Sequence, residues 1–123
     1  MDFSDLPANQ EGLTLDSDVM LCKLYNQYLK RRNDSYYKTE ATRFNIEYIV
    51  KQFFPDWIVE DVHETARELA RRDFLHIHEA NNQVLTVKLT DRGVVYQERR
   101  FARDATKVWQ HIVKLKPLLE IYI

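Results

Sequence analysis

Residues 74–96 read FLHIHEANNQVLTVKLTDRGVVY, a segment in which the spacing of apolar residues changes from helical to alternating. An alternation of apolar and polar residues on both sides of EANNQ predicts two β-strands. Asn81 and Asn82 lie between them, and asparagine tolerates the left-handed backbone that a two-residue hairpin turn requires. The segment therefore predicts a short antiparallel hairpin with the apolar residues Phe74, Ile77, Val84, Leu85, Val87 and Leu89.

A long helix is expected directly after the hairpin. Thr90 is suited to be its N-cap, and Asp91 places a negative charge in its first turn. Gly93 follows, where the absence of a side chain lets the helix approach the hairpin strand closely. One continuous helix over residues 91–116 is predicted, which Pro117 ends or kinks. Its apolar stripe is Val94, Phe101, Ala105, Val108, Ile112, Leu115 and Leu119, with a second line of Val95, Ala102 and Trp109.

Three more helices are predicted before the hairpin. The first has Asp16 or Ser17 as its N-cap and ends at residues 30–32, which are all basic. NDSYYKTEAT, residues 33–42, follows as a polar turn, short strand or loop. ATRFNIEYIVKQFF, residues 41–54, carries a helical stripe and stops before Pro55. The next helix begins at Asp56 as N-cap, so two helices flank a short turn.

The order helix, helix-turn-helix, hairpin, helix is that of a winged-helix domain. ELARRDFLHIHEANNQVLTVKLTDRGVVY, residues 68–96, resembles the corresponding part of MarR-like and PadR-like transcriptional regulators. The resemblance implies a mainly α fold with a small antiparallel β-hairpin (α+β), a winged helix-turn-helix with a long C-terminal helix. We expect a flexible acidic leader over 1–14, a winged-helix core over 15–89, and a C-terminal helix and tail over 90–123. The matching residues are Leu69, Phe74, Leu75, Asn81, Asn82, Leu89, Thr90 and Gly93.

Composition favours one globular domain. Of the 123 residues, 45% are apolar and 30% charged, a balance that argues against bulk disorder. No apolar run is long enough to cross a bilayer and the N-terminus lacks signal-peptide features, so a cytoplasmic protein is expected. Cys22 is the only cysteine, which excludes a disulfide within the chain and favours a buried thiol.

The resemblance also implies a function and its residues. In winged-helix regulators the second helix of the helix-turn-helix enters the major groove of DNA, and the wing contacts the backbone or minor groove. We therefore expect a DNA-binding transcriptional regulator that acts as a homodimer. The expected DNA contacts are Arg43, Arg67, Arg71, Arg72, Asn81 and Asn82. The expected dimer contacts on the last helix are Phe101, Ala105, Val108, Trp109, Ile112 and Leu115.

The distribution of charge supports a different function. Residues 56–73 hold six acids and three arginines, and the wing tip has no Lys or Arg, whereas DNA affinity depends on cations that neutralise phosphates. The alternative is a winged-helix module that binds a basic protein partner through its acidic third helix, without direct DNA binding. The first 20 residues carry five acids and no Lys or Arg. The remaining 103 residues have a net charge of +4, against −1 for the whole chain.

Positive charge is concentrated on the last helix, where residues 91–116 carry seven cations and three acids. These cations are either phosphate contacts or the solvated side of an amphipathic helix. The end of the first helix adds Lys30, Arg31 and Arg32.

Catalysis is not expected. The sequence has no Gly-rich phosphate loop and no paired-carboxylate pattern, and it holds only two glycines. His76 and His78 alternate on one strand, but two histidines without a third ligand are typical of a strand surface rather than of a metal site. No cofactor and no metal are therefore expected, while a small effector pocket between the helices is left open by the resemblance.

Overall fold

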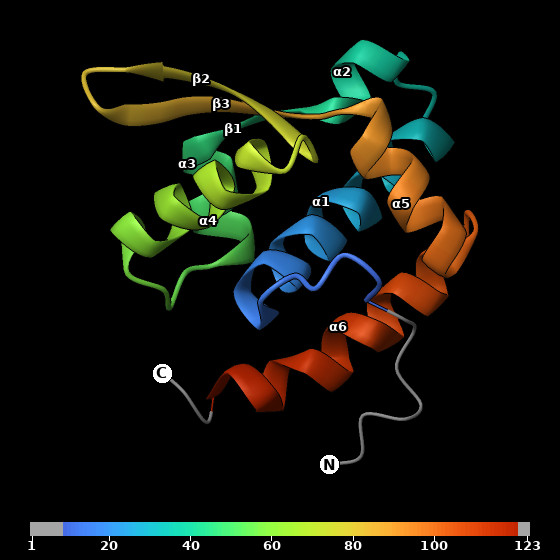
Figure 1. Ribbon diagram of the computed structural model, residues 1–123. Coiled ribbons are helices and arrows are strands. Elements are labelled where there is room, and N and C mark those ends of the chain that lie inside the picture. The colour runs from blue at the N-terminus through green and yellow to red at the C-terminus, as the bar shows by residue number, and fades with distance from the viewer. Residues whose placement is uncertain (1–8, 121–123) are drawn as a thin grey trace.

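The computed structural model of the chain describes residues 9–120. The first eight residues of the expected leader and the last three of the expected tail lie outside this range. Helix α1 (Leu15–Asn33) passes through the middle of the molecule, with α4 and the sheet on one side and α5 and α6 on the other (Figure 1). It contributes much of the core, including Met20, Leu21, Leu24 and Tyr25, all of which are fully buried.

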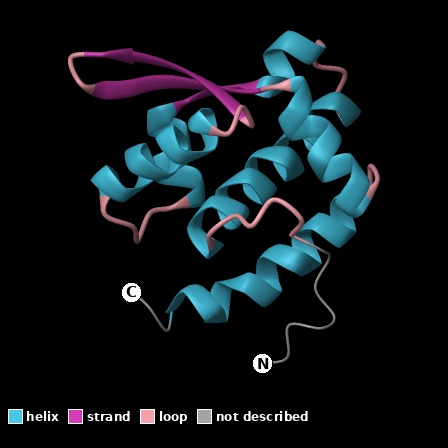
Figure 2. Cartoon of the chain, in the orientation of Figure 1, coloured by secondary structure: helices cyan, strands magenta, loops and turns pink. Residues whose placement is uncertain are grey.

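The other elements follow a simple order. A three-stranded antiparallel sheet with the strand order β1-β3-β2 lies along one edge of the molecule, at the top of the view in Figure 2. Helices α3 and α4 contact this sheet, and α6 runs along α1. The expectation of a mainly α chain with a small antiparallel sheet is confirmed. The elements after α1 are α2 (Lys38–Thr42), β1 (Arg43–Asn45), α3 (Ile46–Tyr48), the π-helical turn η1 (Ile49–Phe53), α4 (Val59–Arg71), β2 (Leu75–Ala80), β3 (Gln83–Leu89), α5 (Asp91–Phe101) and α6 (Ala105–Glu120).

The predicted hairpin is present. Strands β2 and β3 pair up to the Ala80–Gln83 pair, which leaves a two-residue turn. Asn81 and Asn82 have φ angles of 53° and 62°. Positive φ at both central positions is the backbone of a type I′ turn, which matches the right-handed twist of the strands. The sequence thus determined this turn locally.

Helix α5 begins as predicted. The Thr90 side chain accepts a hydrogen bond from the backbone N–H of Gly93 at 3.0 Å, so Thr90 is the N-cap. A Cβ atom on Gly93 would lie 2.4 Å from the carbonyl oxygen of Phe74. Backbone atoms cannot yield as a flexible side chain does, so this contact requires glycine. The predicted reason for Gly93, close approach of helix and strand, is confirmed.

The sequence predicted one helix over residues 41–54, and this prediction is wrong. Arg43–Asn45 instead add strand β1 to the open edge of β3, with Phe44 opposite Val87. Phe44 points into the core and its two neighbours are exposed, an alternation too short to outweigh the helical stripe around it. The Asn45 side chain then accepts from Glu47 N at 2.8 Å and starts the next helical turn.

Two predicted N-caps are wrong. The cap of α1 is Thr14, whose hydroxyl accepts from Ser17 N at 3.2 Å, rather than Asp16 or Ser17. Helix α4 begins at Val59, three residues after Asp56, and has no side-chain cap. The turn before it is instead closed by ring packing between Phe54 and Trp57, whose centroids lie 4.2 Å apart. A local turn, closed by this ring contact and by the hydrogen bond from Trp57 N to Phe54 O, therefore occupies the positions where the sequence predicted the start of the helix.

The predicted continuous C-terminal helix is broken into α5 and α6. Ala102 has φ 53° and ψ −142°, a conformation outside the helical region. The chain is held there by α1, because Tyr25 donates to Ala102 O at 2.6 Å and Asn26 donates to Ala105 O at 3.0 Å. The Asp104 carboxylate accepts from Thr106 N at 3.0 Å at the start of α6. The break folds α6 back onto α1, and Pro117 lies inside α6 rather than at its end.

The described part of the expected leader lies against α5. Asn9 makes two hydrogen bonds with the backbone of Leu13, and its side-chain oxygen accepts from the hydroxyl of Tyr96 at 2.9 Å. Glu11 forms an ion pair with Arg92 at 3.1 Å. Across residues 9–120, no helix combines the length and apolar character needed to cross a membrane.

Candidate functional site

The predicted DNA-contact residues on α4 and the hairpin are largely engaged within the chain. Arg67 donates from Nε to a Glu79 carboxylate oxygen and from Nη2 to the carbonyl of Asn82, both at 2.7 Å. It therefore ties the hairpin tip to α4. Arg71 pairs with Glu64 at 3.1 Å. Each guanidinium already faces an acid on the same surface.

Two further residues predicted to contact DNA lie away from Arg67 and Arg71. Arg72 donates to the carbonyl of Glu11, so it holds the N-terminal segment. Arg43 is exposed on β1, the edge strand opposite β2, and its Cα lies across from that of Lys88. His76 stands on the other side of Lys88 in register, which places Arg43, Lys88 and His76 in one cross-strand row.

The remaining basic residues do not gather on α4. Lys30 and Arg32, at the end of α1, line a cavity of about 460 Å³ together with Arg103. This cavity lies at the corner between α5 and α6, and none of its lining residues belongs to α4. Lys30 and Arg32 of the first helix therefore lie near Arg103 instead of supplementing the predicted DNA-contact surface.

A group of carboxylates surrounds the start of α4. Asp16, Asp56 and Asp61 line a groove of about 500 Å³ together with Ile58, whose side chain is 69% exposed. We call Asp16, Asp56, Ile58 and Asp61 the acidic corner. Burial, and then the charges of Asp61 and Glu68, raise the pKa of Asp16. Within residues 9–120, none of the three aspartates of the corner forms an ion pair.

A second groove, of about 630 Å³, adjoins the first. Both grooves are lined by Asp56, Trp57 and Leu119. The second contains two lysines and two exposed apolar side chains, and we call Lys23, Trp109, Val113 and Lys116 the basic groove. Trp109 is 55% exposed and Val113 51%.

The two lysines of the basic groove lie close enough to influence each other. Burial, and then the charge of Lys116, lower the pKa of Lys23. Lys23 donates to Phe53 O at 2.6 Å, and neither lysine forms an ion pair among the described residues. Like charges are therefore crowded, without compensation by ion pairs, on both halves of one surface.

The residues expected at a dimer interface are divided by the structure. Phe101, Val108, Ile112 and Leu115 are buried in the core of the single chain. Ala105 is half-buried at the start of α6, and Trp109 is exposed. The exposed apolar flank of α6 is therefore Trp109 with Val113, one helical turn further on.

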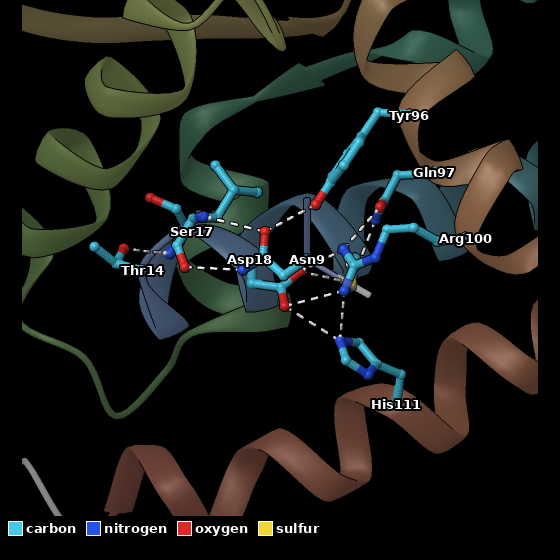
Figure 3. Close-up of polar contacts among 10 residues, drawn as sticks. Asn9, Thr14, Ser17, Asp18, Tyr96, Gln97, Arg100 and His111 are labelled. Atoms are coloured by element: carbon cyan, nitrogen blue, oxygen red, sulfur yellow. Dashed lines mark hydrogen bonds and ion pairs between the residues drawn. The ribbon is translucent and has the colours of Figure 1, made fainter. Parts of the chain in front are cut away.

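A polar cluster joins three helices inside the molecule (Figure 3). The guanidinium of Arg100 on α5 contacts both carboxylate oxygens of Asp18 on α1, at 2.7 and 3.2 Å. His111 Nε2 on α6 lies 3.2 Å from Asp18 and 3.0 Å from Arg100. Cys22 accepts from the Gln97 amide at 3.3 Å. All these side chains are buried, so the cluster sets how α5 and α6 sit on α1.

The cluster changes the acidity of its members. Burial by itself would raise the pKa of Asp18, but hydrogen bonds from His111 and Arg100 overcome this effect and lower it to about 2. Burial and the charge of Asp18 raise the pKa of the Cys22 thiol well above its usual value. Cys22 is thus buried as predicted, and it is a poor nucleophile because nucleophilic attack requires the thiolate.

The same cluster contains side chains of the types that bind metal ions. Asp18, Cys22 and His111 bring three potential ligand atoms within 4.8 Å of one another. The guanidinium of Arg100 already occupies the position of a cation against Asp18, and a metal ion would have to displace this buried charge. The donor set therefore fits an arginine better than a metal.

Sequence reasoning missed the cluster, and it identified the acids at the start of the third helix without joining Asp16 to them. Asp18 counted as a member of an acidic leader and Arg100 as one cation of a solvated helix face. The one local signal was an acid and a cysteine four residues apart on the same helix face. No sequence pattern links residues 18, 100 and 111.

Comparison with known proteins finds no matching family model, curated protein or solved structure.

Proposed function

We propose that the chain is a winged-helix domain that works as a protein-interaction module, with the acidic corner as the surface that binds a basic partner. The winged-helix assignment rests on the succession of α1, the short helix α2, β1, two helical segments around a short turn, and the β2–β3 hairpin. In this comparison α4 corresponds to the recognition helix and the hairpin to the wing.

The charge of α4 and the hairpin carries the proposal. Residues 56–82 contain seven acids and three arginines. All three arginines are engaged within the chain, by Glu79, by Glu64 and by the carbonyl of Glu11. Affinity for DNA arises mainly from cations that displace counterions from phosphates. A surface of this composition repels a phosphate backbone and attracts cationic side chains.

Exposed apolar groups at the same place support a protein ligand. Ile58 is 69% exposed and lines the same groove as Asp56 and Asp61, and Val59, the next residue, is 49% exposed. Apolar side chains bordered by charge are typical of protein interfaces. Nucleic-acid phosphates would gain nothing from Ile58 and Val59.

A second candidate is the DNA-binding regulator expected from the sequence. The cross-strand row of Arg43, Lys88 and His76 favours it, because no acid stands in this row. Exposed ion pairs such as that of Arg71 with Glu64 are weak, so a phosphate can compete for the arginine. In this case Arg43 and Lys88 supply the affinity.

Two binding measurements separate these functions. The first is fluorescence anisotropy with a random-sequence DNA duplex at low salt, for which we expect no saturable binding. The second uses a labelled amphipathic Leu/Lys peptide at nanomolar protein concentration, for which we expect saturable, salt-sensitive binding. Asp56→Asn with Asp61→Asn should abolish peptide binding. Glu40→Gln with Glu47→Gln, which neutralises two exposed acids elsewhere, is the matched control and should leave binding unchanged.

DNA binding that falls steeply with salt and is lost in Arg43→Ala would establish the second candidate instead. Equal peptide binding by the Asp56→Asn, Asp61→Asn variant and its control would show that the acidic corner is not the binding surface.

A further inference from the structure

The acidic corner and the basic groove are two halves of one surface. Asp56, Trp57 and Leu119 line both grooves, so the halves adjoin along these residues. One half presents the carboxylates of Asp16, Asp56 and Asp61, and the other the ammonium groups of Lys23 and Lys116. Each half also has exposed apolar side chains, namely Ile58 on the first and Trp109 with Val113 on the second.

Neither half is neutralised by ion pairs within residues 9–120, although Lys23 donates to the carbonyl of Phe53 and its ammonium lies 4.7 Å from the centroid of the Phe54 ring. The carboxylates of the acidic corner form no ion pairs among the described residues, and the same holds for Lys23 and Lys116. The pKa of Asp16 is raised and that of Lys23 lowered partly by neighbours of like charge. Both crowding effects would be relieved by opposite charges brought from outside the chain.

A second copy of the chain, related to the first by a twofold axis, can provide those opposite charges. When two adjacent halves of opposite sign lie on one face, rotation by 180° about their boundary places each half against the opposite half of the second copy. Asp56 and the half-buried Trp57 lie at this boundary and would come near the axis. Asp16 and Asp61, which line only the first groove, would face Lys23 and Lys116 of the other copy. Trp109 and Val113 of each copy would then contact Ile58 of the other, with the charges around this apolar centre.

We propose that the basic partner of the acidic corner is a second copy of this chain, which binds reciprocally through its basic groove. This inference rests on the proposed function, because it names the partner of the same surface. The dimer covers the first turn of α4, the end that a winged-helix regulator directs towards DNA. It also differs from packing through the buried stripe of the C-terminal helices, since Phe101, Val108, Ile112 and Leu115 stay inside each chain.

Charge reversal gives a test that is specific for a reciprocal interface. One variant carries Lys116→Glu in the basic groove, and the other carries Asp56→Lys with Asp61→Lys in the acidic corner. Each variant by itself places like charges in contact twice per dimer, so its dissociation constant should rise by about tenfold or more. Sedimentation velocity of the full chain measures this loss, relative to a dimer of the unaltered protein.

Mixing the two variants should restore association. The carboxylate introduced at position 116 of the first variant then faces the ammonium groups introduced at positions 56 and 61 of the second, and the two unaltered halves also face each other. Energy transfer between donor- and acceptor-labelled chains should report this heterodimer, and a chain with all three substitutions should again self-associate. Lys107→Glu, on α6 but outside the groove, and Glu47→Lys, outside the corner, are matched controls and should dimerise like the unaltered protein.

Three results would overturn the inference. They are a monomer at the highest soluble concentration, a mixture of folded variants that does not recover association, and controls that weaken the dimer as much as the variants do. A monomer that still binds the Leu/Lys peptide through Asp56 and Asp61 would point to a different protein as partner and leave the proposed function intact. DNA binding without peptide binding would contradict the proposed function itself.

Discussion

At the scale of single residues, Gly93 is a position where the neighbouring backbone leaves no room for a side chain. Gly93→Ala would place a methyl group against the carbonyl of Phe74 and force β2 and α5 apart. We expect the free energy of unfolding to fall by about 1–2 kcal/mol. Overpacking costs roughly 1–3 kcal/mol, and the higher helix propensity of alanine relative to glycine offsets up to about 1 kcal/mol of this cost. Urea unfolding measures the change.

Val95→Ala is the control for this prediction, because Val95 lies on the same helix and is 43% exposed. Its effect should stay within about 0.5 kcal/mol, as is usual for a surface position. A Gly93→Ala protein as stable as the unaltered one would show that close packing is not the reason for this glycine.

Asp18 gives a prediction for pH dependence. Its pKa is lowered from 3.8 to about 2 in the folded chain, so the folded state binds the proton less tightly than the unfolded state does. The stabilisation is therefore fully present above about pH 4 and is lost as the pH falls towards 2, with a total of about 2 kcal/mol. Urea unfolding at several pH values from 5 to 2 should show this loss.

Two measurements isolate Asp18 from other carboxylates. The side-chain carboxyl resonance of Asp18 should titrate at about pH 2 by NMR. The stability difference between the unaltered protein and Asp18→Asn should shrink as the pH falls, although this variant is strongly destabilised near neutral pH because Arg100 loses its partner charge. A difference that does not vary with pH would contradict the assignment.

At the scale of elements, the break between α5 and α6 determines where the C-terminal helix lies. Ala102 adopts φ 53° and ψ −142°, a conformation that glycine reaches without strain. Ala102→Gly should therefore stabilise the chain by about 1 kcal/mol. Thermal unfolding followed by circular dichroism tests this gain.

The comparison for this prediction is Ala70→Gly in α4, where the backbone is helical. That change should destabilise by about 1 kcal/mol through helix propensity. If both substitutions destabilise equally, residues 91–120 are better described as one helix in solution.

At the scale of the whole molecule, the proposed dimer links stability to concentration. Association stabilises the folded state by mass action, so the unfolding midpoint should rise as protein concentration increases. Scanning calorimetry over a hundredfold range of concentration measures the trend. Lys116→Glu should reduce the dependence on concentration, and Lys107→Glu should preserve it. A midpoint independent of concentration would argue against the dimer.

Several features held by contacts between near neighbours in the sequence were predicted, and several features held by contacts between distant residues were not. The hairpin turn at Asn81 and Asn82 and the cap at Thr90 were predicted because each depends on neighbours within a few residues. The strand at residues 43–45 was not predicted, because it forms only by pairing with residues 86–88. The break at Ala102 was also missed, since hydrogen bonds from Tyr25 and Asn26 help to hold it.

The candidate surface divides in the same way. Acids outnumber arginines within residues 56–73, which is visible in the sequence and already argued against the prediction of DNA binding. The pairing of Arg67 with Glu79 and the meeting of Lys23 with Lys116 required the folded chain. Composition therefore indicated that the α4 surface is negatively charged, but it could not indicate which of its charges lack an ion-pair partner in the folded chain.

The sequence by itself determined the hairpin with its two-residue turn, the cap at Thr90, the position of Gly93 and the acidity of α4, because these follow from backbone preferences and nearby side chains. Only the tertiary structure decided that Asp18, Arg100 and His111 share one buried cluster and that opposite charges adjoin on one face. Those contacts join residues up to 93 positions apart. Such pairings are selected by packing of the whole core, which no local pattern encodes.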